Sequence, residues 1–164
     1  MQDEVDRLVA AWGRERPDLD VRPLEVLSRV TRLARHLDRA RRSAFAAHGL
    51  ESWEFDVLAA LRRAGRPYAL SPGRLLDQTL VTSGTMTNRV DRLQDRGLVE
   101  RLPDLTDRRG VRVRLTPKGR QRVDAAFADL LDRERELLAD LSEADQQLLA
   151  TLLRRLVVPF DDAR

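Results

Sequence analysis

The chain has 164 residues, of which 42% are hydrophobic and 35% charged, and its formal net charge is +3. It contains no cysteine, which excludes disulfides, thiol catalysis and cysteine-ligated zinc. There is no apolar run of about 18 residues and no apolar signal segment at the start, so we expect a cytoplasmic protein with no membrane partner.

The first third of the chain predicts two helices joined by a proline-containing connector. Residues 3–14 carry apolar side chains at helical spacing, and the prolines within 16–23 break that pattern. A long helix is expected over 24–47, and Gly49 is a suitable stop. Its apolar stripe runs through Val26, Val30, Leu33, Leu37, Ala40 and Ala44.

Two shorter helices should follow. Ser52 is expected to cap a helix over 53–64, which a glycine then ends. Ser71 is followed by proline, the residue favoured at the first helical position, and this pair predicts a helix over 72–78.

A third helix and a hairpin are predicted next. Thr82 can cap a helix that runs to Arg96, and two strands are expected at 98–102 and 111–115. The second strand alternates, so we expect one apolar face turned inward and one basic face turned outward. The inward residues would be Val111, Val113 and Leu115, and the outward ones Arg112 and Arg114.

The last part of the chain predicts two more helices. One starts at the cap Thr116, and Ser142 with Asp145 resembles a capping box for the other. The final helix carries a leucine stripe that is too rich for a lone exposed helix, so we expect a homodimer. The stripe is Leu148, Leu149, Leu152, Leu153 and Leu156.

This order of elements predicts a mainly α fold with a small β-hairpin wing, that is, a winged helix-turn-helix with a helical dimerisation region. On the helix after Thr82 the buried stripe would be Met86, Val90 and Leu93, which leaves small or hydrogen-bonding residues facing out. Such a face can enter a major groove, while arginines at a wing tip favour the minor groove. The predicted DNA contacts are Ser71, Thr82, Ser83, Thr85, Thr87, Asn88, Arg92, Arg108, Arg109 and Arg112. The alternative is a plain amphipathic helix beside a solvated hairpin.

Two stretches carry a family resemblance. "DLTDRRGVRVRLTPKG" resembles the wing signature of the multiple-antibiotic-resistance regulator (MarR) family, and "TSGTMTNRVDRLQDRGLVER" resembles its recognition helix and first wing strand. The resemblance implies a homodimer whose terminal helices interlock on a pseudo-palindromic DNA operator. It divides the chain into an N-terminal extension at 1–20 that covers a ligand pocket, a dimerisation region at 21–50 and 117–164, and a winged unit at 51–116.

Three further stretches resemble the urate-responsive branch of that family: "AAWGRERPDLD", "WEFDVLAALRRAG" and "SGTMTNRVDRL". The resemblance implies a pocket built from Trp12, Asp56 and Arg89. Arg101 would join it by the same comparison, and Arg63, beside Arg62, is a further candidate for its lining. The implied effector is urate or a related small aromatic anion.

The residues themselves are compatible with this pocket. Asp56 is the lone acid in an apolar run, so we expect it to be buried and to need a partner. Arg89 lies beside the buried stripe of its helix and could meet either Asp56 or an anionic ligand, while Trp12 could stack on a flat ring. The alternative is an Asp56–Arg89 salt bridge, with Trp12 as simple packing.

Other function classes have less support. The sequence shows no glycine-rich phosphate loop, no nucleophile with a nearby histidine and no metal constellation, so we expect no enzyme, metal site or cofactor. Two readings stay open beside a urate-responsive repressor: a regulator that responds to a phenolic acid or another ligand, and an architectural DNA-binding protein without a sensor.

Overall fold

The computed structural model describes residues 2–79, 82–104 and 110–161. Its elements, in chain order, are α1 (Glu4–Glu15), α2 (Pro23–Ala47), α3 (Ser52–Arg63), β1 (Ala69–Leu70), α4 (Pro72–Thr79), α5 (Ser83–Asp95), β2 (Val99–Pro103), β3 (Val111–Leu115), α6 (Pro117–Leu137) and α7 (Glu143–Asp161). The predicted mainly α fold with a small wing is therefore confirmed.

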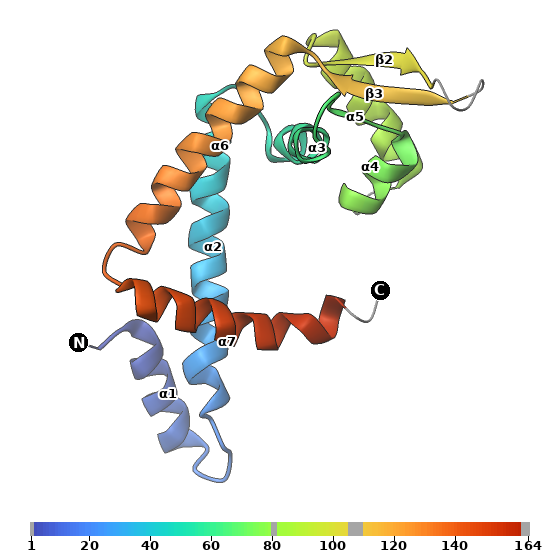
Figure 1. Ribbon diagram of the computed structural model, residues 1–164. Helices are drawn as coiled ribbons and strands as arrows, with labels where there is room; N and C mark the ends of the chain where they lie inside the picture. The colour runs from blue at the N-terminus through green and yellow to red at the C-terminus, as the bar shows by residue number, and fades with distance from the viewer. Residues whose placement is uncertain (1, 80–81, 105–109, 162–164) are drawn as a thin grey trace.

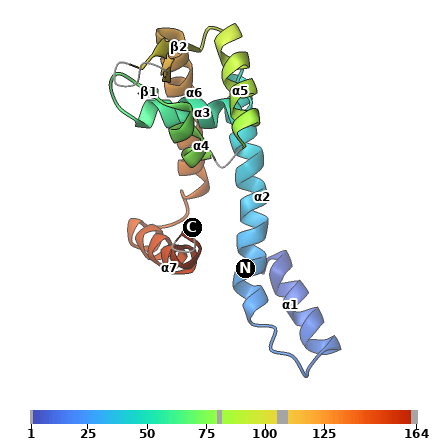
Figure 2. The same cartoon turned by 90° about the vertical axis from the view of Figure 1, so that its right-hand side faces the viewer.

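Two long helices connect the two ends of the molecule. α2 and α6 pack against each other and carry α3, α4, α5 and the sheet at one end, while α1 and α7 lie toward the other end (Figure 1). The view turned by 90° shows that α7 stands apart from α2, although the two cross in the first view (Figure 2). The chain therefore consists of a winged unit, α3 to β3, and a helical extension, which comprises α1, the first half of α2 and α7.

Side chains that begin the helices explain most of the boundaries. Thr82 Oγ1 accepts a hydrogen bond from the Thr85 amide at 3.4 Å, and Thr116 Oγ1 accepts one from the Gly119 amide at 3.0 Å. The prediction that Ser52 caps α3 is wrong: the cap is the preceding Glu51, whose amide donates to a Glu54 carboxylate oxygen at 2.9 Å.

The sheet has three strands rather than the predicted two. β1 pairs antiparallel with β3, with Leu70 opposite Val113, and β2 pairs with the other edge of β3. Val113 and Leu115 are buried as expected, but the inward position predicted for Val111 is wrong, since it is 41% exposed. Val111 pairs with Pro103 at the end of the ladder farthest from the core, where the wing extends beyond α3 and α5.

The core lies within the winged unit and the adjoining parts of α2 and α6. The predicted buried stripe of α5 is confirmed, because Met86, Val90 and Leu93 are each at most 2% exposed. Gly119 allows α6 to start against β2: a Cβ at this position would lie 1.9 Å from the Leu98 carbonyl oxygen. A larger residue at position 119 would therefore force α6 and Leu98 apart.

The helical extension has little interior of its own. Val5 is the one buried residue of α1, and none of the described residues of α7 is buried. Large apolar side chains are exposed along α1, the first half of α2 and α7. They are Leu8, Trp12, Val26, Leu27, Val30, Leu33, Leu148, Leu152, Leu156, Val157, Val158 and Phe160.

Ion pairs fasten α1 to α2. Arg29 contacts Asp3 at 2.8 Å and Asp6 at 2.6 Å, and Arg32 pairs with Glu4. The hydrogen bond from the Arg29 side chain lowers the pKa of Asp3 to about 2. Within the described residues, no helix has both the length and the apolar character that a bilayer crossing requires.

Candidate functional site

The first half of α5 presents the polar surface that the sequence predicted. Thr82, Ser83, Thr85, Thr87 and Asn88 are all exposed, while the opposite side of the same helix is buried in the core. Because the buried stripe fixes the rotation of the helix, these side chains face solvent together. A helix held in this way can offer its outer face to the edges of base pairs.

The hydroxyl groups of this surface are already ordered by local contacts. The Thr82 and Thr85 hydroxyls lie 2.9 Å apart, and the Thr87 hydroxyl donates to the Ser83 carbonyl at 3.2 Å. Ser71, half-buried at the start of α4, accepts from the Arg74 amide at 3.4 Å. Each hydroxyl retains further bonding capacity for a ligand such as a phosphate oxygen.

The wing contributes its two strands to this side of the molecule. Arg108 and Arg109, predicted for its tip, lie outside the described residues. Arg112 is half-buried and donates to the Ala69 carbonyl at 2.8 Å, and Arg114 pairs with Glu100 at 2.9 Å. These two strand arginines thus stabilise the three-stranded sheet, a role that the alternation pattern alone did not reveal.

A cluster that sequence reasoning missed connects α3 to α5. We call it the Trp53 cluster, and it consists of Glu51, Trp53, Arg89 and Arg92. The guanidinium carbon of Arg92 lies 4.7 Å from the centre of the Trp53 ring and that of Arg89 lies 5.4 Å from it. Glu51 accepts from the indole N–H at 2.8 Å and from Arg92 at 2.9 Å. Both predicted functional arginines of α5 are therefore held by one indole ring.

Asp56 lies one turn after Trp53 on α3, and the prediction that it is buried is wrong. Its neighbours Phe55 and Val57 are buried, but Asp56 itself is exposed because it points out of the core. The surrounding protein still removes enough water from it to raise its pKa, an effect that the positive charges of Arg41, Arg89 and Arg63 partly oppose.

The expected partners of Asp56 are only partly assembled around it. Among the ion pairs of the described residues, none joins Asp56 to Arg89, which lies against Trp53 instead. Arg63 is exposed and lines a groove of about 260 Å³ between α3 and α6, whose apolar wall includes Phe55 and Phe127. Asp56 and Arg63 therefore belong to the same side of α3.

Two other predicted pocket residues lie elsewhere in the chain. Trp12 is 48% exposed on α1, which is far from α3 and α5 in both views (Figures 1 and 2). Arg101 on β2 contacts Asp91 at 2.6 Å and Gln94 at 3.1 Å, both on the exposed side of α5. A single chain thus brings Asp56, Arg89 and Arg63 into one neighbourhood and leaves out Trp12 and Arg101.

The carboxyl end of α5 is anchored to three other segments of the chain. Arg96, just after the helix, pairs with Glu54, whose side chain is 1% exposed and which is the only buried charged residue in the described part of the chain. Arg96 also donates to the Gly49 carbonyl at 2.6 Å and accepts from Lys118 Nζ at 2.8 Å through its own carbonyl oxygen. The end of α5 is therefore fixed to the turn after α2, to α3 and to α6.

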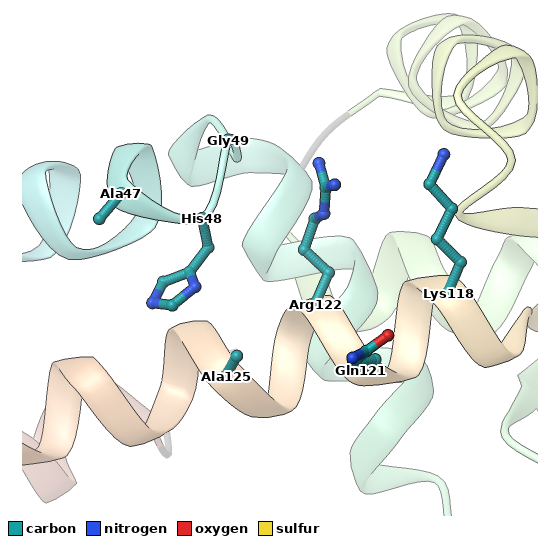
Figure 3. Close-up of a pocket in the computed structure, with 7 residues that line it drawn as sticks. All are labelled: Ala47, His48, Gly49, Lys118, Gln121, Arg122 and Ala125. Carbon is teal, nitrogen blue, oxygen red and sulfur yellow. The ribbon is translucent and has the colours of Figure 1, made fainter.

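An open depression of about 450 Å³ lies beside this anchor. The turn after α2 forms one wall with Ala47, His48 and Gly49, and α6 forms the other. Lys118 and Arg122 project from the same side of α6, and the His48 ring points toward that helix (Figure 3). The depression contains none of the predicted ligand residues, so it is separate from the neighbourhood of Asp56.

Comparisons with known proteins agree with this geometry. The MarR family model matches residues 48–110. The transcriptional regulator PecS of Dickeya dadantii is 38% identical over 152 residues, which cover 93% of this chain and 92% of PecS.

Solved structures give the same result. A mutant MarR from E. coli complexed with operator DNA has a TM-score of 0.67 and 27% identity, covering 85% of this chain and 99% of that one. BpsR of Bordetella bronchiseptica has a TM-score of 0.59 and 28% identity, covering 77% of this chain and 91% of that one. The DNA binding of BpsR is regulated by 6-hydroxynicotinic acid.

The winged unit, the exposed polar face of α5 and the matches to named regulators lead to one conclusion. The chain belongs to the MarR family of winged-helix transcriptional regulators.

Proposed function

We propose that the protein is a repressor that binds a pseudo-palindromic operator as a homodimer and releases it when a small aromatic anion such as urate binds. The observation that carries this proposal is the exposed polar half of α5, held in place by a fully buried opposite face. A related MarR is known in complex with operator DNA, which supports a role in DNA recognition for the exposed face of α5.

The dimer is supported by the helical extension. Leu148, Leu152 and Leu156 repeat along one side of α7 and are between 46% and 57% exposed. Monomeric soluble proteins rarely expose apolar patches of this extent, so a second copy is the natural cover for it. Two-fold symmetry would then place the two α5 helices in successive major grooves, about one turn of DNA apart. The proposal includes the division of the chain into an N-terminal extension at 1–20, a dimerisation region at 21–50 and 117–164, and a winged unit at 51–116.

The effector site is proposed at Asp56 and Arg89. Arg89 is held by the face of an indole rather than by a carboxylate, so its charge is available to an anion. The Asp56 carboxyl can accept an N–H from a purine ring, and Arg63 adds positive charge beside it. If Trp12 takes part, it comes from the partner subunit, since the chain's own Trp12 is remote.

Ligand binding and DNA binding would be linked through α5, because Arg89 lies on the helix that reads DNA. A ligand that moves Arg89 shifts the helix with it. A tenfold loss of operator affinity requires that the ligand bind the free form more tightly by about 1.4 kcal/mol.

DNA binding is tested with a duplex from the protein's own upstream region and a scrambled duplex of equal length. A regulator should prefer the first by about a thousandfold or more. Equal affinity for both duplexes would instead support an architectural DNA-binding protein.

The ligand is tested by thermal melting with urate, xanthine, hypoxanthine, salicylate and 6-hydroxynicotinate, followed by release from the upstream duplex. The last compound is included because it regulates DNA binding of BpsR. Urate should raise the melting temperature and release DNA from the wild type, and Arg89→Gln and Asp56→Asn should weaken both effects. If both variants respond to urate as the wild type does, the site is not at these residues.

A further inference from the structure

Arg92 of α5 is a predicted DNA contact, and in the free chain it is bound to side chains of α3 and its cap. It follows Asn88 by four residues and therefore shares the helix face that we assign to DNA. In the free chain its guanidinium contacts the Glu51 carboxylate at 2.9 Å and lies over the Trp53 ring at 4.7 Å. The Arg92 and Glu51 side chains are 53% and 59% exposed, so solvent and a DNA phosphate can both reach this pair.

Glu51 is well placed to retain Arg92. It caps α3, which is buried along most of its length, so its backbone position is fixed. The indole N–H of Trp53 donates to one carboxylate oxygen while Arg92 contacts the other. These hydrogen bonds and the Arg92 charge lower the pKa of Glu51, so the carboxylate stays charged at neutral pH.

The geometry points to Glu51 as an electrostatic brake on DNA binding: together with Trp53 it holds Arg92 on α3 and must release it before Arg92 can meet a phosphate. A carboxylate beside the docked phosphate backbone adds repulsion to this cost. The inference rests on the proposed DNA binding of α5 and is independent of the identity of the effector. It assigns to an acidic residue of α3 a role in setting the affinity of the recognition helix.

The principal test is Glu51→Gln. Glutamine keeps the side-chain length and the oxygen that accepts from Trp53, and it removes the charge that retains Arg92. We expect operator binding to tighten by about fourfold, because an exposed ion pair changes an equilibrium constant by a factor of about two and a dimer has two such pairs. The measurement is a fluorescence-anisotropy titration with the upstream duplex at fixed salt, without effector.

A double-mutant cycle with Arg92→Gln distinguishes a specific brake from a general charge effect. Arg92→Gln alone should weaken binding and reduce the slope of log K against log salt by about 0.9 for each lost phosphate contact. In that background Glu51→Gln should give no further tightening. A gain of the same size with and without Arg92 would show that net charge alone is responsible and would overturn the inference.

Asp38→Asn is the matched control. Asp38 pairs with Arg42 on α2 at 2.7 Å, and its exposure of 59% equals that of Glu51. This variant makes the same change in net charge but releases no residue of α5, so DNA affinity should stay within a factor of about two. A gain of about fourfold here would refute the brake.

Trp53→Phe provides a second variant in case Glu51→Gln disturbs the α3 cap. Phenylalanine removes the N–H that positions Glu51 and weakens the stacking of Arg92, so binding should tighten, by less than with Glu51→Gln. If the wild type shows no preference for the upstream duplex, the proposed function fails and this inference fails with it. If the wild type prefers that duplex and neither variant binds it more tightly, the inference alone is wrong.

Discussion

The winged unit and the helical extension differ in how much of their apolar surface is buried within the chain. In the winged unit, side chains from α3, α5 and the sheet meet one another, and Leu58, Leu61 and Leu93 are fully buried. In the extension, α7 has no buried residue and its leucines face solvent. The first region is stabilised by contacts within the chain, whereas the second leaves apolar side chains exposed, and we propose that a second copy of the chain covers them. Stability and assembly should therefore respond to different residues.

The largest effect is expected in the core of the winged unit. Leu58→Ala should lower the free energy of unfolding by about 2–5 kcal/mol, because it removes packed methyl groups and leaves a cavity. Chemical denaturation followed by circular dichroism measures this. Leu152→Ala on α7 is the control, and at concentrations where the chain is monomeric it should cost less than about 0.5 kcal/mol. Equal costs would contradict the division into closed and open regions.

A smaller loss should follow from adding a side chain at Gly119, where the start of α6 lies close to the backbone of Leu98. Gly119→Ala places a methyl group against the Leu98 carbonyl, and forcing the two elements apart should cost about 1–3 kcal/mol. Gly73→Ala, at a helical position with nothing within 4 Å, should leave the melting temperature unchanged or slightly raised. A neutral Gly119→Ala would mean that α6 can move away from the sheet without cost.

Assembly should change without loss of the winged unit when the α7 stripe becomes charged. The double variant Leu152→Glu and Leu156→Glu should sediment at half the mass of the wild type and lose its operator preference. Its unfolding free energy, measured under conditions where the wild type is also monomeric, should change by less than about 0.5 kcal/mol. A double variant that remains a dimer would show that α7 is not the interface.

The smallest effect concerns the contact of α1 with α2 and depends on pH. The pKa of Asp3 is lowered from 3.8 to about 2, mainly by the hydrogen bond from Arg29. A lowered pKa means that the folded form prefers the ionised group, so this stabilisation is present above pH 4 and is lost as the pH falls toward 2. Protection of the α1 amides against hydrogen exchange, corrected for the intrinsic exchange rate, should fall over that interval. Asp3→Asn should reduce this dependence without abolishing it, because Glu4 also has a lowered pKa and pairs with Arg32.

Local patterns predicted the order of elements because local rules govern them. Thr82 and Thr116 cap their helices as expected, and the period of Met86, Val90 and Leu93 placed the buried face of α5 correctly. The same period placed Arg89 beside that face, where it is half-buried. When a residue caps a helix or belongs to a regular apolar stripe, its structural role can therefore be predicted from its neighbours along the chain.

Contacts between distant segments were not predictable in this way. β1 has only two residues, too few for a strand pattern, and it exists because β3 pairs with it. Asp56 has buried neighbours on both sides in the sequence and still points outward, because its position around the helix rather than local composition decides its exposure. The Trp53 cluster joins the start of α3 to arginines about 40 positions later, and a single sequence contains no signal for that pairing.

The anchor at Arg96 has a mechanical consequence. At its carboxyl end α5 is held by Glu54 of α3, the Gly49 carbonyl in the turn after α2, and Lys118 of α6, while its amino end carries the exposed polar residues. A helix of 13 residues is about 20 Å long, so a tilt of about 5° around that fixed end displaces the opposite end by roughly 2 Å. In the proposed operator complex this amino end meets the bases, where a displacement of that size is enough to misalign hydrogen bonds that tolerate only tenths of an ångström.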